Sequence, residues 1–156
     1  MTTQEYLSQI SRLNRVINNK TKELLQLREL ATSVSSVKNE ERVQTTPNFD
    51  KIGAAYCKIS SLEEKIENLV DKYIKIREKI IKEIESIEDE TEYQVLFSHY
   101  IVGEKLEKIS QDMNYVYRNI TRLHGKAIKN FEKKYGNEYL SYNVLECPIE
   151  NMIQVK

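Results

Sequence analysis

Two long series of apolar residues run along the first half of the chain with alternating steps of three and four. The first series comprises Tyr6, Ile10, Leu13, Ile17, Lys20, Leu24, Leu27 and Ala31, and the second comprises Ile52, Ala55, Ile59, Leu62, Ile66, Leu69, Tyr73, Ile76 and Ile80. A sustained mean spacing of about 3.5 residues keeps one narrow stripe of a helix facing a partner helix. Each series therefore predicts a coiled-coil helix, about 26 and about 36 residues long respectively.

Residues 32–50, between the two series, are rich in Ser, Thr and Asn, contain Pro47 and show no periodicity. They predict a connector. Its length allows the two helices to fold back as a long antiparallel hairpin, and it equally permits pairing between two chains as a homodimer. Lys20, a charge within the first seam, is the kind of residue that specifies register or oligomeric state in either arrangement. The segment ERVQTTPNFDK is either a simple loop or a contact to a partner or the DNA backbone through Arg42.

Residues 95–131 predict three successive helical segments. Val95, Leu96 and Tyr100 fall on one face of the first segment. Gly103 ends that segment, because glycine tolerates the left-handed conformation that a helix terminus often needs. The first segment therefore has one apolar face and a defined end.

The second and third segments carry a continuous apolar stripe across the turn that joins them. The second covers about 104–113 and the third about 116–134, with apolar positions at Leu106, Ile109, Met113, Ile120, Leu123, Ala127 and Phe131. Asn114 lies in the turn, where asparagine accepts a positive φ more readily than other non-glycine residues. This spacing predicts a helix-turn-helix.

The outward face of the third segment carries basic and hydrogen-bonding side chains. They are Tyr117, Arg118, Asn119, Thr121, Arg122, Lys126 and Lys129. Arginine pairs with guanine, asparagine pairs with adenine, and lysine neutralises phosphate. Residues 104–134 hold eight Lys or Arg against four Asp or Glu, whereas the whole chain has a net charge of zero. We therefore expect this helix to bind double-stranded DNA in the major groove; a solvated amphipathic helix is the alternative.

The stretch VLFSHYIVGEKLEKISQDMNYVYRNITRLHGKAIKNF resembles region 4 of bacterial sigma factors. It is more similar still to the ArpU-like phage transcriptional regulators, in which a sigma-like region 4 follows a helical amino-terminal half. The matching places are Tyr100, Gly103, Leu106, Ile109, Asn114 and 117–131. With TQEYLSQISRLNRVINNKTKELLQLRELATSV and ERVQTTPNFDKIGAAYCKISSLEEKI, the resemblance covers most of residues 1–134.

The resemblance implies a role in transcription regulation of phage or prophage genes, with host RNA polymerase as a candidate partner. The implied major-groove contacts fall on Tyr117, Arg118, Thr121 and Arg122, with Asn119 beside them. Two positions depart from the family pattern. Asn114 replaces the turn glycine, and Val116 replaces the Ser or Thr that begins the recognition helix. Valine cannot cap a helix, and losing the cap costs about 1 kcal/mol and one phosphate contact.

Changes of composition divide the chain into three regions. We predict a helical hairpin in residues 1–88, a DNA-binding domain in 89–134 and an extension in 135–156. The acidic stretch IESIEDETE marks the first boundary, where Thr91 is a candidate helix cap. The extension opens with Tyr135 and Gly136, has no helical period and carries a charge of −2, from three Glu and one Lys.

No pattern in the sequence predicts catalysis or a bound cofactor. Cys57 and Cys147 lie far apart, and neither His99 nor His124 completes a zinc-binding or catalytic spacing. We expect both histidines to pack or to face solvent. No apolar run approaches the length of a membrane span, so we expect an intracellular soluble protein. The resemblance to phage regulators then implies the cytoplasm of the bacterial host cell.

The sequence as a whole predicts an all-α protein that is not an enzyme. The expected function is sequence-specific DNA binding in transcription regulation. Two alternatives remain: a small terminase-associated DNA-packaging protein, which would form a ring, and an oligomeric interaction protein that does not bind DNA.

Overall fold

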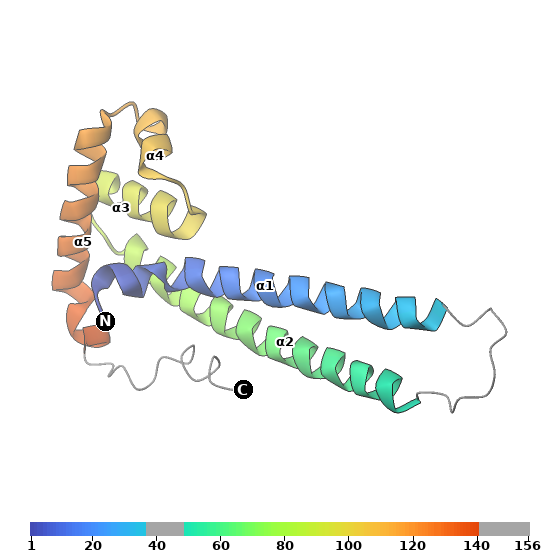
Figure 1. Cartoon of the computed structure of the whole chain (residues 1–156). Helices are drawn as coiled ribbons and strands as arrows, with labels where there is room; N and C mark the ends of the chain where they lie inside the picture. Colours follow the sequence, from blue (N-terminus) through green and yellow to red (C-terminus); the bar gives the residue numbers. More distant parts are fainter. Residues whose placement is uncertain (37–48, 141–156) are drawn as a thin grey trace. The chain divides into compact units, whose positions relative to one another are not determined.

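The computed structural model describes residues 1–36 and 49–140, without the side chains of 33–36, 49–52 and 138–140. Within this part of the chain every regular element is helical, as predicted. The elements are α1 (Thr3–Ser36), α2 (Phe49–Glu85), α3 (Glu90–Leu96), the π-helix η1 (Phe97–Val102), α4 (Leu106–Asp112) and α5 (Tyr117–Leu140) (Figure 1). None of the described helices contains a segment that is both long and apolar enough to cross a membrane.

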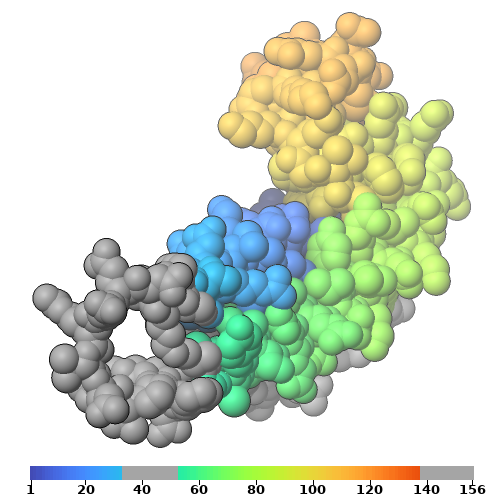
Figure 2. Space-filling view, turned by 90° about the vertical axis from the view of Figure 1, so that its right-hand side faces the viewer, coloured from blue at the N-terminus to red at the C-terminus, as the bar shows by residue number. Residues whose placement is uncertain are grey.

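Residues 12–75 form one compact unit, in which α1 and α2 run antiparallel beside each other (Figure 1). Leu24, Ile59 and Leu62 form a buried cluster against which Leu27, Ala31 and Ile66 pack. All six residues belong to the two predicted seams. The other described seam positions of this unit are at least partly buried; they are Leu13, Ile17, Lys20, Ala55, Leu69 and Tyr73. In the space-filling view, the blue side chains of α1 lie against the green ones of α2 (Figure 2).

Helix α1 continues beyond residue 32, where the sequence predicted the connector to begin. The Thr32 hydroxyl donates a hydrogen bond to the Arg28 carbonyl oxygen at 3.1 Å, so it bonds to the preceding turn instead of ending the helix. The helix reaches Ser36, and α2 begins at Phe49. Arg42 and most of the connector lie outside the described residues.

The second compact unit combines residues 1–11 with the chain from residue 76 onward. Its three-helix core contains Val95 from α3, Ile109 from α4 and Ile120 from α5. Leu106, Met113 and Leu123 pack against these three. Ala127 and Phe131 are also buried. The apolar stripe predicted for the second and third segments is therefore confirmed.

Two backbone predictions in this unit are also confirmed. Gly103 has a φ of 86° and Asn114 a φ of 55°, both left-handed. Between α3 and Gly103 the chain forms η1, which the apolar spacing did not predict. The amide groups of Gly103 and Glu104 both donate to the Ser98 carbonyl oxygen, so the π-helix ends at Gly103.

The first turns of α1 pack within this same unit. The Tyr6 hydroxyl donates to Glu83 Oε2 at 2.9 Å, and its ring centroid lies 6.3 Å from that of Phe131. Ser86 also shares a hydrogen bond with the Tyr135 hydroxyl. The unit therefore includes residues on both sides of the boundary predicted near residue 88.

Two predicted helix ends differ from those observed. Helix α5 continues to Leu140, because Tyr135 packs on Phe131 with ring centroids 5.2 Å apart and Gly136 is buried. Residues 141–156 of the predicted extension lie outside the described residues. At the start of α3 the cap is Asp89, whose side chain accepts hydrogen bonds from two backbone amides, and Thr91 donates its hydroxyl to this cap.

Candidate nucleic-acid interface

The structure brings five of the predicted DNA-contacting residues together in the first two turns of α5. Tyr117, Arg118, Thr121 and Arg122 are exposed, and Asn119 is partly buried. Arg122 Nη2 donates to Asn119 Oδ1 at 3.1 Å. These five residues and Val116 line an open hollow of about 750 Å³. Arginine, amide and hydroxyl groups that can hydrogen-bond to base edges therefore share one accessible surface.

The turn before α5 fixes where this surface begins. The Tyr115 amide donates to the Ser110 carbonyl oxygen at 2.9 Å, which ties the turn to the end of α4. The Val116 carbonyl oxygen accepts a hydrogen bond from the Asn119 amide at 2.8 Å, which begins helix α5. The Val116 side chain is 75% exposed and has no oxygen to cap the helix. The Tyr115 side chain is exposed as well.

Lys126 differs from the other predicted contacts because it is held by acidic residues of the same chain. Its ammonium nitrogen lies 2.8 Å from Glu92 Oε1 and 3.6 Å from Asp89 Oδ2. The hydrogen bond and charge of Glu92 raise the pKa of Lys126, with a smaller contribution from Asp89. Its positive charge therefore compensates a carboxylate before any partner is present.

Glu92, the buried partner of Lys126, was not predicted from the sequence. It is only 1% exposed, and both of its carboxylate oxygens accept from Asn130 Nδ2 at 2.9 Å. A buried carboxylate is stable only when paired, so Glu92 requires α5 to present both Asn130 and Lys126 to α3. Its position three residues before Val95 and four before Leu96 places it on the buried helix face, and this spacing was the available signal.

The cations on the outer face of α5 lack such internal partners. Arg118, Lys129 and Lys133 form no ion pair with any residue in the described part of the chain, and all three are exposed. Together with Arg122 they recur at spacings of four, seven and four, which keeps them on one side of a helix with 3.6 residues per turn. The opposite side carries the buried Ile120 and Ala127. We call Arg118, Arg122, Lys129 and Lys133 the basic face; Lys133 was not among the predicted contacts.

Both histidines pack where η1 meets α5. His99 Nδ1 lies 2.8 Å from the Glu104 carbonyl oxygen, and His124 Nε2 lies 3.2 Å from the Tyr100 hydroxyl. The two imidazole rings meet edge to face with centroids 5.0 Å apart. Burial, with a smaller contribution from the charge of His99, lowers the pKa of His124 to about 4, and burial raises the pKa of Tyr100 to about 12. The His124 ring and the Tyr100 hydroxyl are therefore neutral at pH 7, and both side chains support α5 by packing.

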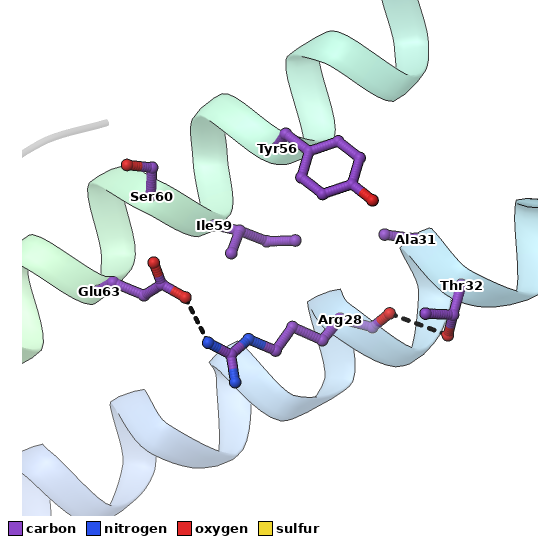
Figure 3. Close-up of a pocket in the computed structure, with 7 residues that line it drawn as sticks. All are labelled: Arg28, Ala31, Thr32, Tyr56, Ile59, Ser60 and Glu63. Atoms are coloured by element: carbon purple, nitrogen blue, oxygen red, sulfur yellow. Dashed lines mark hydrogen bonds and ion pairs between the residues drawn. The ribbon is translucent and has the colours of Figure 1, made fainter.

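A second hollow, of about 440 Å³, lies in the other unit between α1 and α2 (Figure 3). Tyr56 and Ile59 of α2 face Ala31 of α1 across it, and Arg28 forms an ion pair with Glu63 along one side. Both charged side chains are about half exposed, so this pair contributes about 0–1 kcal/mol. The hollow presents an exposed ion pair and an aromatic ring, with no arrangement that points to a chemical step.

No group of three or more His, Cys, Asp or Glu in residues 1–36 and 49–140 is placed to hold a metal ion. The chain matches no protein-family model, no curated protein and no solved structure. Inference about function therefore rests on the geometry of α5 and its supporting helices.

Proposed function

We propose that this chain is a sequence-specific DNA-binding transcription regulator that inserts the amino-terminal half of α5 into the major groove of duplex DNA. The observation that carries the proposal is the basic face, whose cations are exposed on the side of α5 opposite its core. Because Ile120 is fully buried, the rotation of α5 about its own axis is fixed and Arg118 and Arg122 stay turned outward. Paired arginines on a rigid helix suit recognition of guanine edges.

In this proposal α4, the turn at Asn114 and α5 act as a helix-turn-helix. The positive φ of Asn114 reverses the chain within a short turn, and Leu106, Ile109 and Met113 bring α4 onto the core shared with α5. In such motifs the first helix crosses the DNA backbone while the second enters the groove. The resemblance of residues 95–131 to sigma region 4 supports regulation of phage or prophage genes, with host RNA polymerase as a further partner.

We further propose that α1 and α2 form an antiparallel coiled-coil hairpin within a single chain. The cluster of Leu24, Ile59 and Leu62 supports this arrangement, because residues from both predicted seams bury one another without a second chain. We assign the hairpin a scaffolding role.

Binding to short DNA duplexes across a series of salt concentrations tests the proposed function. Each phosphate contact that is neutralised by a lysine or arginine releases a counterion, so affinity should fall steeply as salt rises. Wild-type affinity that does not change with salt, or no binding at low salt, contradicts the proposal. Light scattering on the same sample adds a second test, since a ring-sized oligomer would favour the packaging alternative.

Two variants separate base recognition from phosphate binding. Arg122→Ala should weaken binding to the preferred sequence by about 1–3 kcal/mol and have less effect on other sequences. Lys129→Ala should weaken binding to all sequences alike and reduce the salt slope by about 1. Lys72→Ala is the matched control, because Lys72 is an exposed lysine of α2 outside the proposed interface. Equal losses for Arg122→Ala on every duplex would contradict its role in reading sequence.

A further inference from the structure

Gly125 lies in the interior of α5, although nothing in the described structure requires a glycine there. A Cβ atom built at this position would meet no atom within 4 Å. Its φ is not positive, unlike that of Gly103, so no special backbone conformation is involved. Glycine inside a helix is less stable than alanine because it has more conformational freedom to lose on folding. Neither packing nor backbone geometry within the chain accounts for this residue.

Gly125 lies beside the basic face, between Arg122 and Lys129 along the helix. It lies three residues after Arg122 and four before Lys129, so the three residues share one side of the helix. Arg118 and Lys133 extend the same side by one further turn in each direction. Gly125 therefore lies between two cations. Glu132 also lies on this side of the helix, but the four Lys and Arg residues outnumber it, and the net positive charge complements a polyanion.

We infer that duplex DNA makes its closest approach to α5 at Gly125, where the absent side chain allows the helix backbone to sit deep against the nucleic acid. The inference rests on the proposed function and adds a depth-setting residue to it. A helix with its side chains is about 10–12 Å across, and the major groove is about 12 Å wide, so a side chain at the point of contact changes the fit. The flanking cations then reach phosphates or bases on both sides of the contact.

Gly125→Ala should have opposite effects on stability and on DNA binding. The melting temperature should rise by about 2 °C, because alanine favours the helix and its methyl group meets nothing in the chain. Affinity for a short mixed-sequence DNA duplex should fall about tenfold, because the added methyl group occupies a close contact. Gly125→Leu should weaken binding further while leaving the helix folded.

Gly53 supplies the matched control, since it is an exposed glycine in α2 whose Cβ would also meet no atom within 4 Å. Gly53→Ala and Gly53→Leu should leave DNA affinity unchanged. The inference is overturned if Gly125→Ala binds DNA as well as wild type, if it lowers the melting temperature, or if the Gly53 variants lose affinity to the same extent. Wild-type protein that fails to bind any duplex overturns the proposed function itself, which distinguishes the two failures.

Discussion

The α1–α2 pair and the three-helix core of the other unit bury their side chains to different depths. In the pair, the buried side chains of residues 12–75 remain 2–9% exposed; they are Leu13, Leu24, Ile59, Leu62 and Leu69. In the three-helix core, Val95 and Ile120 are fully buried. Two helices can cover only one stripe of each other, whereas a third helix closes the remaining side and excludes water.

The same difference governs where each region places its charges. Arg28 and Glu63 of the helix pair meet in a half-exposed ion pair, which solvent screens. Glu92 of the three-helix core is buried, so it depends on Asn130 and Lys126 of α5. An exposed ion pair contributes little to stability, whereas a buried carboxylate such as Glu92 needs its partners. Glu92 therefore couples α3 to α5.

The largest expected contrast is the cost of truncating a core residue in each region. Ile120→Ala should reduce the free energy of unfolding by about 3–4 kcal/mol, because a fully buried side chain leaves a cavity. Ile66→Ala should cost only about 1 kcal/mol, since Ile66 is partly exposed and water can fill the space that it leaves. Urea denaturation followed by circular dichroism measures both. Equal losses would show that the helix pair is as enclosed as the three-helix core.

Acid should destabilise the unit that contains α5 before it affects the helix pair, which has no histidine. His124 is less basic in the folded chain, with its pKa lowered from 6.5 to about 4, so protons favour the unfolded state. This contribution to stability is fully present above about pH 6.5 and is lost as the pH falls toward about 4. We expect about 1–2 kcal/mol, allowing for solvent screening of a half-buried ring.

Thermal unfolding of wild type and His124→Gln across this pH range measures the effect. Glutamine can still bond to the Tyr100 hydroxyl but does not titrate, so the variant should lose stability less steeply on acidification. Parallel curves for the two proteins would show that another group is responsible.

The smallest expected effect comes from restoring a cap to α5. Val116→Ser should stabilise the chain by about 0.5–1 kcal/mol, because a hydroxyl at this position accepts from an unpaired amide of the first turn. The added oxygen should also strengthen DNA binding slightly. Val116→Ala is the control without a capping atom, and similar stability for the two variants would place the helix start elsewhere. Chemical denaturation resolves the difference.

Sequence periodicity predicted the features that depend on local spacing. The seams of α1 and α2, the stripe through Ile109 and Ile120 and the left-handed residues Gly103 and Asn114 are all examples. Each follows from the residue type and its neighbours within two helical turns, so no long-range information is needed.

Features that depend on contacts between distant segments were not predictable in this way. Beyond Lys134, helix α5 is supported by the hydrogen bond between Tyr135 and the distant Ser86. The ion pair of Lys126 likewise depends on the distant, buried Glu92. Tyr100 is buried in the π-helix η1, as the apolar pattern predicts for this position. The pattern does not distinguish the hydrogen-bond spacing of a π-helix from that of an α-helix. At the candidate interface, spacing identified the side chains that α5 exposes, but it gave no sign that one of its lysines was already paired.

The contact of Tyr6 with Glu83 and Phe131 has a consequence for how this chain is made. The two rings are separated by most of the described sequence, yet they pack within one unit. During synthesis the segment that holds Tyr6 emerges long before α5, so its contact with Phe131 forms only after α5 has been translated. The packing of Tyr6 on Phe131 is therefore a late event in the assembly of this unit.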